Sequence, residues 1–241
     1  MGPYLGTPNK EKDSENGEND YFRYGATSMQ GWRKSQEDAH IAHFMGDVAL
    51  FGVFDGHGGK EVSIFVKEVF ASELQKLPEY KSKDYGAALK AVFRRMDEML
   101  ESEEGEAKLK EIQAKHSSSS PDPFSSMQDA SSIASFTGCT ATVVLITKDQ
   151  IYCANAGDSR SVLGRSNGPK MCEPLSEDHK PENPEERARI EAAGGFVEEN
   201  RVNGSLNLSR SMGDFEYKSK KELKYTEQQV IVDPEIKKVP R

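Results

Sequence analysis

The sequence has little of what a secreted or membrane protein needs. Its 241 residues contain three cysteines, Cys139, Cys153 and Cys172, an odd number without the spacing of a zinc site. Reduced thiols in a cytoplasmic or nuclear protein are therefore expected. No apolar run approaches the roughly 18 residues that a membrane helix requires. Residues 8–20 are densely charged, so we expect no secretory signal at the start of the chain.

Excess positive charge and a lipidation signal are also missing. The formal net charge of -8 argues against non-specific nucleic-acid binding, which needs a basic surface. Pro3 follows Gly2, and Gly6 stands where a myristoylation motif has Ser or Thr, so we do not expect N-terminal myristoylation. The remaining composition, 35% hydrophobic and 30% charged, is typical of a globular chain of one or two domains.

The most informative stretch is FGVFDGHGGKEV, residues 51–62. The apolar run 49–54 predicts a buried strand that ends at Asp55, and apolar residues at helical spacing begin soon after His57. A carboxylate, an imidazole and open backbone carbonyls at a strand end suit a hard metal ion. A glycine-rich turn between strand and helix that binds no ligand explains the same residues about equally well.

A predicted hairpin adds an independent indication of a metal site. Residues 41–45 and 48–54 have the composition of two strands joined by a tight turn. Antiparallel pairing would bring Glu37 and Asp38, before the first strand, close to Asp55 at the end of the second. Carboxylates gathered in this way repel one another unless a cation or protons intervene.

The other predicted elements do not alternate regularly as in a parallel sheet. We expect a flexible tract at 1–20, helices at about 60–76 and 84–115, and a mobile serine-rich insertion near 112–135. Further strands are predicted at 140–147, 150–156 and 161–165, and a further helix at 183–194 with a turn at 167–168 before it. Antiparallel sheets packed on each other with helices outside, an α+β fold, are therefore expected.

Between about residues 22 and 235 the chain contains, in order, RYGATSMQGWR, QEDAH, FGVFDGHGGKEV, FTGCTATVVLI, CANAGDSRSVL, DHKPENPEERARIEAAGGFV and RVNGSLNLSRSMGDFEYK. These blocks resemble the type 2C family of metal-dependent protein serine/threonine phosphatases. The resemblance implies a catalytic domain over 21–241 with an antiparallel β-sandwich between helices, in α-β-β-α layers. It also implies two Mn²⁺ or Mg²⁺ ions and hydrolysis of phosphoserine and phosphothreonine in proteins. The attacking group would be a hydroxide bridging the ions, without a phospho-enzyme.

The resemblance implies a metal-binding role for Glu37, Asp38, Asp55, Gly56 and Asp158. Asp55 would bridge both ions, Asp38 would act through water, and Asp158 would belong to a weaker third site. The ligand at Gly56 would be its backbone carbonyl.

The resemblance also implies two catalytic residues. Arg33 would hold the substrate phosphate, which the planar guanidinium suits, and His57 would protonate the leaving oxygen. Asp214 lies in a matching block and is interpreted as structural. A tyrosine-phosphatase mechanism needs a cysteine and an arginine at a spacing that Cys153 and Arg160 do not have, so Cys153 is interpreted as a core residue.

The chain departs from the family pattern at its end. Two further aspartates of the family, in a DG and a DN motif, lie beyond the last matched block, and the sequence reaches Arg241 before either. We therefore expect the family's C-terminal strands and one set of metal ligands to be missing.

Two hypotheses follow from this departure: the chain is part of a longer phosphatase, or it is a short form with little activity that binds phosphoproteins or regulates them. A third class, independent of the departure, is a structural β-sandwich without a site. The last leaves the acidic residues at strand ends unexplained. Phosphoproteins are the expected partners, and the complete domain is expected to be a monomer.

Overall fold

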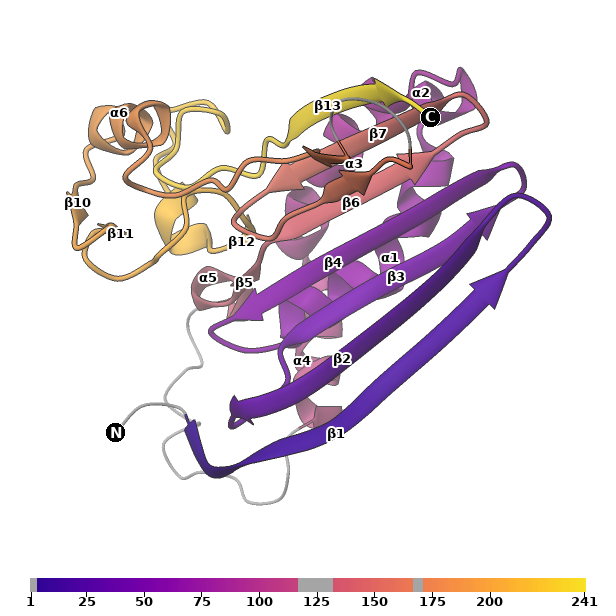
Figure 1. The fold of residues 1–241 in the computed structure, drawn as a ribbon. Coiled ribbons are helices and arrows are strands. Elements are labelled where there is room, and N and C mark those ends of the chain that lie inside the picture. Colours follow the sequence, from indigo (N-terminus) through magenta and orange to yellow (C-terminus); the bar gives the residue numbers. More distant parts are fainter. Residues whose placement is uncertain (1–3, 117–131, 167–170) are drawn as a thin grey trace.

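The computed structural model describes residues 4–116, 132–166 and 171–241 (Figure 1). Its central feature is a seven-stranded sheet. The strands are β3 (Asp38–Met45), β4 (Val48–His57), β5 (Gly138–Cys139), β6 (Ala141–Ile146), β7 (Gln150–Ala156), β12 (Met212–Gly213) and β13 (Glu235–Pro240). Their order is β12-β5-β4-β6-β7-β13, and β3 pairs with β4 beside this path. All pairings are antiparallel, so the expected α+β fold of antiparallel sheets and helices is confirmed.

The hairpin of β3 and β4 is confirmed, and its register pairs Asp38 with Asp55. Side chains alternate along β4: Leu50 and Phe54 are fully buried in the main core, whereas Val53 is exposed. This period of two is why a short apolar run forms a strand with one face toward the helices. The second predicted hairpin, β6 with β7, is also confirmed.

Helices α1 (Glu61–Lys76), α3 (Tyr85–Leu100) and α4 (Glu103–His116) lie together on one face of the central sheet, with the short α2 (Pro78–Lys81) between the first two in sequence (Figure 1). The prediction of a single helix over 84–115 is wrong, because the helix is interrupted between α3 and α4. Ser102 Oγ accepts a hydrogen bond from Gly105 N at 3.0 Å and so begins a new helix. Gly105 packs so tightly on the Met99 carbonyl that no side chain would fit there.

The apolar stripes of these helices form the main core with the inner face of the sheet. The fully buried members include Val62, Val66, Phe70 and Leu74 of α1 and Leu89, Val92, Phe93 and Met96 of α3. Burying such a side chain contributes about 1.5–3 kcal/mol, so this interface is the main support of the rim at which β4 ends.

Strands β1 (Tyr4–Glu18) and β2 (Arg23–Arg33) form a separate antiparallel pair, so the structure differs from the flexible tract expected over 1–20. The ring of Tyr24 lies 5.6 Å from those of Phe44 and Phe51, which holds β2 against the central sheet. Most β1 side chains are exposed. Backbone hydrogen bonds to β2 therefore hold β1 in place. Because every residue type carries these backbone groups, the polar sequence gave no indication of a strand.

The insertion predicted near 112–135 has helical residues at both of its ends. Residues 112–116 form the end of α4, and α5 (Ile133–Phe136) occupies the other end of the predicted stretch. The other residues of that prediction, 117–131, lie outside the described residues, as does the turn predicted at 167–168.

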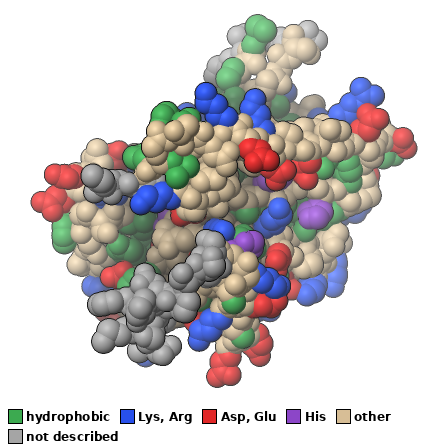
Figure 2. All heavy atoms as spheres, turned by 90° about the horizontal axis from the view of Figure 1, so that it is seen from below, with side chains coloured by type: hydrophobic (Ala, Val, Ile, Leu, Met, Phe, Trp, Pro, Cys, Tyr) green, Lys and Arg blue, Asp and Glu red, His purple; other side chains and the backbone are tan. Residues whose placement is uncertain are grey.

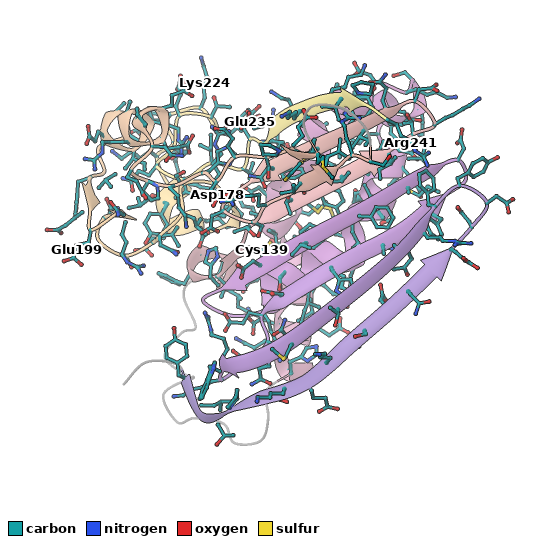
Figure 3. The ribbon with its side chains drawn as sticks, viewed as in Figure 1. Cys139, Asp178, Glu199, Lys224, Glu235 and Arg241 are labelled. Atoms are coloured by element: carbon teal, nitrogen blue, oxygen red, sulfur yellow. The ribbon has the colours of Figure 1, made fainter. Side chains whose placement is uncertain are left out.

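The C-terminal part forms a lobe beside the sheet (Figure 1). It contains α6 (Pro184–Ala192), β10 (Val197–Glu198), β11 (Arg201–Val202) and the 3-10 helix η2 (Phe215–Lys218). Ile190, Val202 and Val230 form a small core of its own. The short pair β8 (Val162–Gly164) and β9 (Cys172–Pro174) lies instead over β7 and β13, where Leu163 packs against Ile151, Cys153 and Val239. Cys139 of β5, which pairs with both Gly56 and Met212, lies where the lobe meets the sheet (Figure 3).

Side-chain distribution is unremarkable outside the core. Cys139 and Cys153 are buried and all three cysteines are free thiols, which confirms Cys153 as a core residue. No helix among the described residues has the length and apolar character to cross a bilayer. On the face shown in Figure 2, acidic and basic side chains are interspersed rather than gathered in one patch of a single sign.

Candidate active site

The ends of β3 and β4 bring two predicted metal ligands together. Asp38 and Asp55 are paired in the hairpin register. Partial burial, the charge and hydrogen bonding of Asp38, and the charge of Asp158 together raise the pKa of Asp55 to about 6. Because the two carboxylates are adjacent, ionising both of them costs electrostatic free energy.

Thr140 anchors this strand end to the neighbouring one. Asp55 N donates to Thr140 Oγ1 at 3.3 Å, and Thr140 N donates to the Asp55 carbonyl at 2.9 Å. The same hydroxyl lies 2.6 Å from Ser159 Oγ, next to Asp158 at the end of β7. Thr140 was not predicted as a site residue, because its role depends on a contact between strands.

Gly56 is held by the backbone of the segment before β3. Gly56 N donates to the Glu37 carbonyl at 3.2 Å, and Ser63 Oγ of α1 donates to that carbonyl at 2.6 Å. A Cβ at Gly56 would lie 2.5 Å from the same oxygen, so only glycine permits this approach.

The side chain of Glu37 faces Arg33. Its carboxylate accepts a hydrogen bond from Ser35 Oγ at 2.8 Å and lies 3.5 Å from Arg33 Nη2. The structure therefore brings the backbone of Glu37 to Gly56 and its carboxylate to Arg33. The Arg33 side chain is 55% exposed at the end of β2, which leaves much of the guanidinium open to a ligand.

His57, the last residue of β4, is paired with a buried acid. Its Nε2 lies 2.7 Å from Asp214 Oδ2, and Ser211 Oγ donates to that oxygen at 2.5 Å. Burial would lower the pKa of His57, but the hydrogen bond and charge of Asp214, with the charges of Asp55 and Asp158, raise it overall. The interpretation of Asp214 as structural missed this contact, since its only sequence signal is its place in the block SRSMGDFEYK.

Asp158 follows β7 and forms an ion pair with Lys180. Its charge acts on both Asp55 and His57, so the structure brings all three to one region. Close by in the sequence, Arg160 donates two hydrogen bonds, of 2.9 and 2.8 Å, to Asp178. Asp158 thus already has a cationic partner, whereas Asp38 and Asp55 form no salt bridge within the described residues.

The chemistry of these donors fits a hard divalent cation, although the set is small. Asp38 and Asp55 offer carboxylate oxygens with no lysine or arginine beside them, which is the preferred environment of Mg²⁺ or Mn²⁺. Among residues 4–116, 132–166 and 171–241, no group of three or more His, Cys, Asp or Glu side chains is arranged to hold a metal ion. The residues present therefore match part of a metal site.

Comparison with known proteins adds to this geometry. The family model for protein phosphatase 2C matches residues 22–241. Probable protein phosphatase 2C 2 of Paramecium tetraurelia is 46% identical over 241 residues, spanning 99% of this chain and 74% of that protein. Protein phosphatase 2C 1 of the same organism is 46% identical over 240 residues, with the same coverage of 99% and 74%.

Solved structures show the same fold. The crystal structure of a phosphatase from a pathogenic strain of Toxoplasma gondii superposes with a TM-score of 0.63 at 24% identity, covering 96% of this chain and 72% of that one. A serine-threonine phosphatase 2C from Toxoplasma gondii gives a TM-score of 0.60 at 21% identity, covering 99% and 76%. Both likenesses concern the arrangement of the backbone.

Proposed function

Because the chain belongs to the protein phosphatase 2C family of metal-dependent protein serine/threonine phosphatases, we propose that it removes phosphate from phosphoserine and phosphothreonine in proteins at the rim formed by Asp38 and Asp55. One observation carries the proposal. Two adjacent carboxylates, fixed in register on a rigid hairpin, form no ion pair with a lysine or arginine among the described residues, and the pKa of Asp55 is raised to about 6 although the charge of His57 opposes the shift. Such a pair is stabilised by a divalent cation.

Four residues at this rim would hold the ions: Asp55 through its carboxylate, Asp38 through water, Gly56 through its carbonyl, and Glu37 through the carboxylate that now lies beside Arg33. Asp158 would serve a further ion once its ion pair with Lys180 opens. When bound, the ions would activate a water molecule for attack on phosphorus and neutralise charge on the phosphoryl group, so no phospho-enzyme is needed.

Arg33 and His57 would act on the substrate itself. The exposed guanidinium of Arg33 would bind two phosphate oxygens, for which its planar fork is suited. Against the effect of burial, the hydrogen bond and charge of Asp214 raise the pKa of His57 and so favour the protonated imidazole, whose proton would pass to the serine or threonine oxygen as it leaves.

Phosphate release from a phosphothreonine peptide in Mn²⁺ tests this function. We expect turnover by the wild-type chain and a loss of at least about a thousandfold in Asp55→Asn, because several kcal/mol of charge stabilisation depend on the ions. Asp149→Asn, at the exposed turn before β7, is the matched control and should retain full turnover.

A second candidate is a short, inactive form that binds phosphoproteins. The small donor set among the described residues favours it. Fluorescence anisotropy with the same labelled phosphothreonine peptide separates the two. Binding that Arg33→Ala abolishes, with no phosphate release at any Mn²⁺ concentration, would support the binding module and contradict the phosphatase.

A further inference from the structure

We propose that Asp214 is a positioning residue for His57: it holds the imidazole by Nε2 and so presents Nδ1 to the leaving oxygen of the substrate. The inference rests on the proposed function and deepens it. It extends the site beyond the residues that the family resemblance implied.

The two side chains are buried to different extents. The carboxylate of Asp214 is 3% exposed and the imidazole of His57 is 23% exposed, with 2.7 Å between Oδ2 and Nε2. The acid therefore lies behind the ring. Nδ1 makes no hydrogen bond within the described part of the chain, so the ring nitrogen that remains available is the one directed away from Asp214.

The loop that carries Asp214 is fixed in an unusual conformation. Asp214 has φ 56° and ψ 41°, in the left-handed region that non-glycine residues seldom adopt, and Gly213 before it has φ 77°. A non-glycine residue held there is strained and persists only where its surroundings fix it. Such strain often occurs at functional sites, which supports a role for this side chain.

A buried ion pair supplies those surroundings. Asp97 of α3 accepts a hydrogen bond from Gly213 N at 2.9 Å and from Lys218 Nζ at 2.6 Å. Lys218 Nζ also donates to the Ser211 carbonyl at 2.8 Å. The residues on both sides of Asp214 are thus tied to the rigid helix α3.

A glycine leaves room for the pair. Gly138 of β5 lies opposite His57 in the sheet, and a Cβ there would clash with both Asp214 Oδ2 and His57 Nε2. Three elements, β4, β5 and the loop after β12, therefore meet at one hydrogen bond. A change at Gly138 would separate the two groups without removing either.

The chemical step balances with these atoms. Water supplies the oxygen that forms the new bond to phosphorus, and the bond between phosphorus and the serine or threonine oxygen breaks. That oxygen takes its electron pair and the Nδ1 proton of His57. The imidazole is then neutral with its proton on Nε2, the tautomer that Asp214 accepts a hydrogen bond from.

The test compares two substrates. A phosphothreonine peptide has a poor leaving group that needs the proton, whereas p-nitrophenyl phosphate has a good one that needs it little. Asp214→Ala should lower kcat for the peptide about tenfold to a hundredfold more than kcat for p-nitrophenyl phosphate, as expected for partial loss of general-acid catalysis. Gly138→Ala should shift the ratio in the same direction, and Asp214→Asn, which keeps an acceptor, should shift it less.

Glu186→Gln is the control for general destabilisation, because Glu186 is another buried carboxylate that touches Ser209 and Arg210 rather than His57. Glu186→Gln should lower kcat for both substrates in the same proportion. If Asp214→Ala does the same, the proposal is overturned. Wild-type chain without turnover of either substrate would instead contradict the proposed function.

A measurement without substrate decides the proposal in that case too. The chain has five histidines, and His57 can be assigned by comparison with His57→Gln in long-range ¹H–¹⁵N spectra at alkaline pH. Wild-type protein should show His57 protonated on Nε2, and Asp214→Ala should show a mixture of tautomers. An unchanged tautomer in Asp214→Ala would overturn the inference.

Discussion

Asp55, which keeps contact with water at the sheet rim, and Glu186, which is buried on α6, are both carboxylates, yet their pKa values move in opposite directions. Burial alone would raise the pKa of Glu186, but hydrogen bonds and charges of Arg210 and Arg189 lower it to about 2. Burial and the acidic neighbours Asp38 and Asp158 together raise the pKa of Asp55 to about 6.

The difference lies in the partners that the chain provides. Glu186 accepts hydrogen bonds from Arg210 Nη2 at 2.6 Å and Ser209 Oγ at 2.6 Å, and lies 2.8 Å from Arg189 Nη1. Asp55 has Asp38 and Asp158 beside it instead, and the charge of His57 offsets only part of their effect on its pKa. A carboxylate whose charge is compensated by arginine serves the fold, whereas one left among other acids is suited to bind a cation from solution.

The largest expected effect is at Glu186, the carboxylate whose charge is compensated by arginines. Glu186→Ala should lower the free energy of unfolding by about 3–5 kcal/mol, because two arginines lose their buried partner. Urea denaturation measures this, with Asp149→Ala as the exposed control. A loss below about 1 kcal/mol would show that Glu186 does not hold the lobe together.

Adding Mn²⁺ should change stability only through the acidic site at Asp55. At about a hundred times its dissociation constant, the ion should raise the free energy of unfolding of the wild-type chain by about 2.7 kcal/mol, and Asp55→Asn should not respond. The readout is the urea midpoint with and without Mn²⁺. Equal shifts in both proteins would place the ion elsewhere.

Removing one acid should relieve repulsion when no ion is bound. In EDTA at neutral pH, Asp55→Asn should be more stable than wild type by up to about 1 kcal/mol, a small value because the side chain is partly open to water. Asp38→Asn should behave alike. A variant of Asp55 that is clearly less stable than wild type would mean that its charge is compensated after all.

The pH dependence should have opposite signs at the two sites. Asp55 has a pKa of 3.8 unfolded and about 6 folded, so the native state binds the extra proton and its contribution to stability falls as pH rises through this window. Glu186 has a pKa of 4.5 unfolded and about 2 folded, so its contribution is lost as pH falls through that window.

Differences in unfolding free energy between wild type and each neutral variant, Asp55→Asn or Glu186→Gln, isolate these contributions from other titrating groups. Slopes of the same sign in both differences would remove the contrast between the two carboxylates.

Local patterns sufficed for the elements that hold the rim. Strand composition on both sides of a tight turn in 41–54 predicted the hairpin, and an antiparallel hairpin admits few registers, so the approach of Asp38 to Asp55 followed from it. The apolar stripe after Gly59 likewise predicted α1. Strand β1 and the break before α4 were not predicted, since they depend on backbone pairing and on a packed glycine.

By itself the sequence determined the family, the hairpin and the acids at strand ends, because these depend on residue types and short spacings. Only the tertiary structure decided which acid meets which partner. Asp214 reaches His57 across 157 positions of chain, and Glu186 reaches Arg210 across 24. The charge state of a carboxylate depends on such neighbours, and nothing in the local sequence distinguishes an acid that meets an arginine from one that meets another acid.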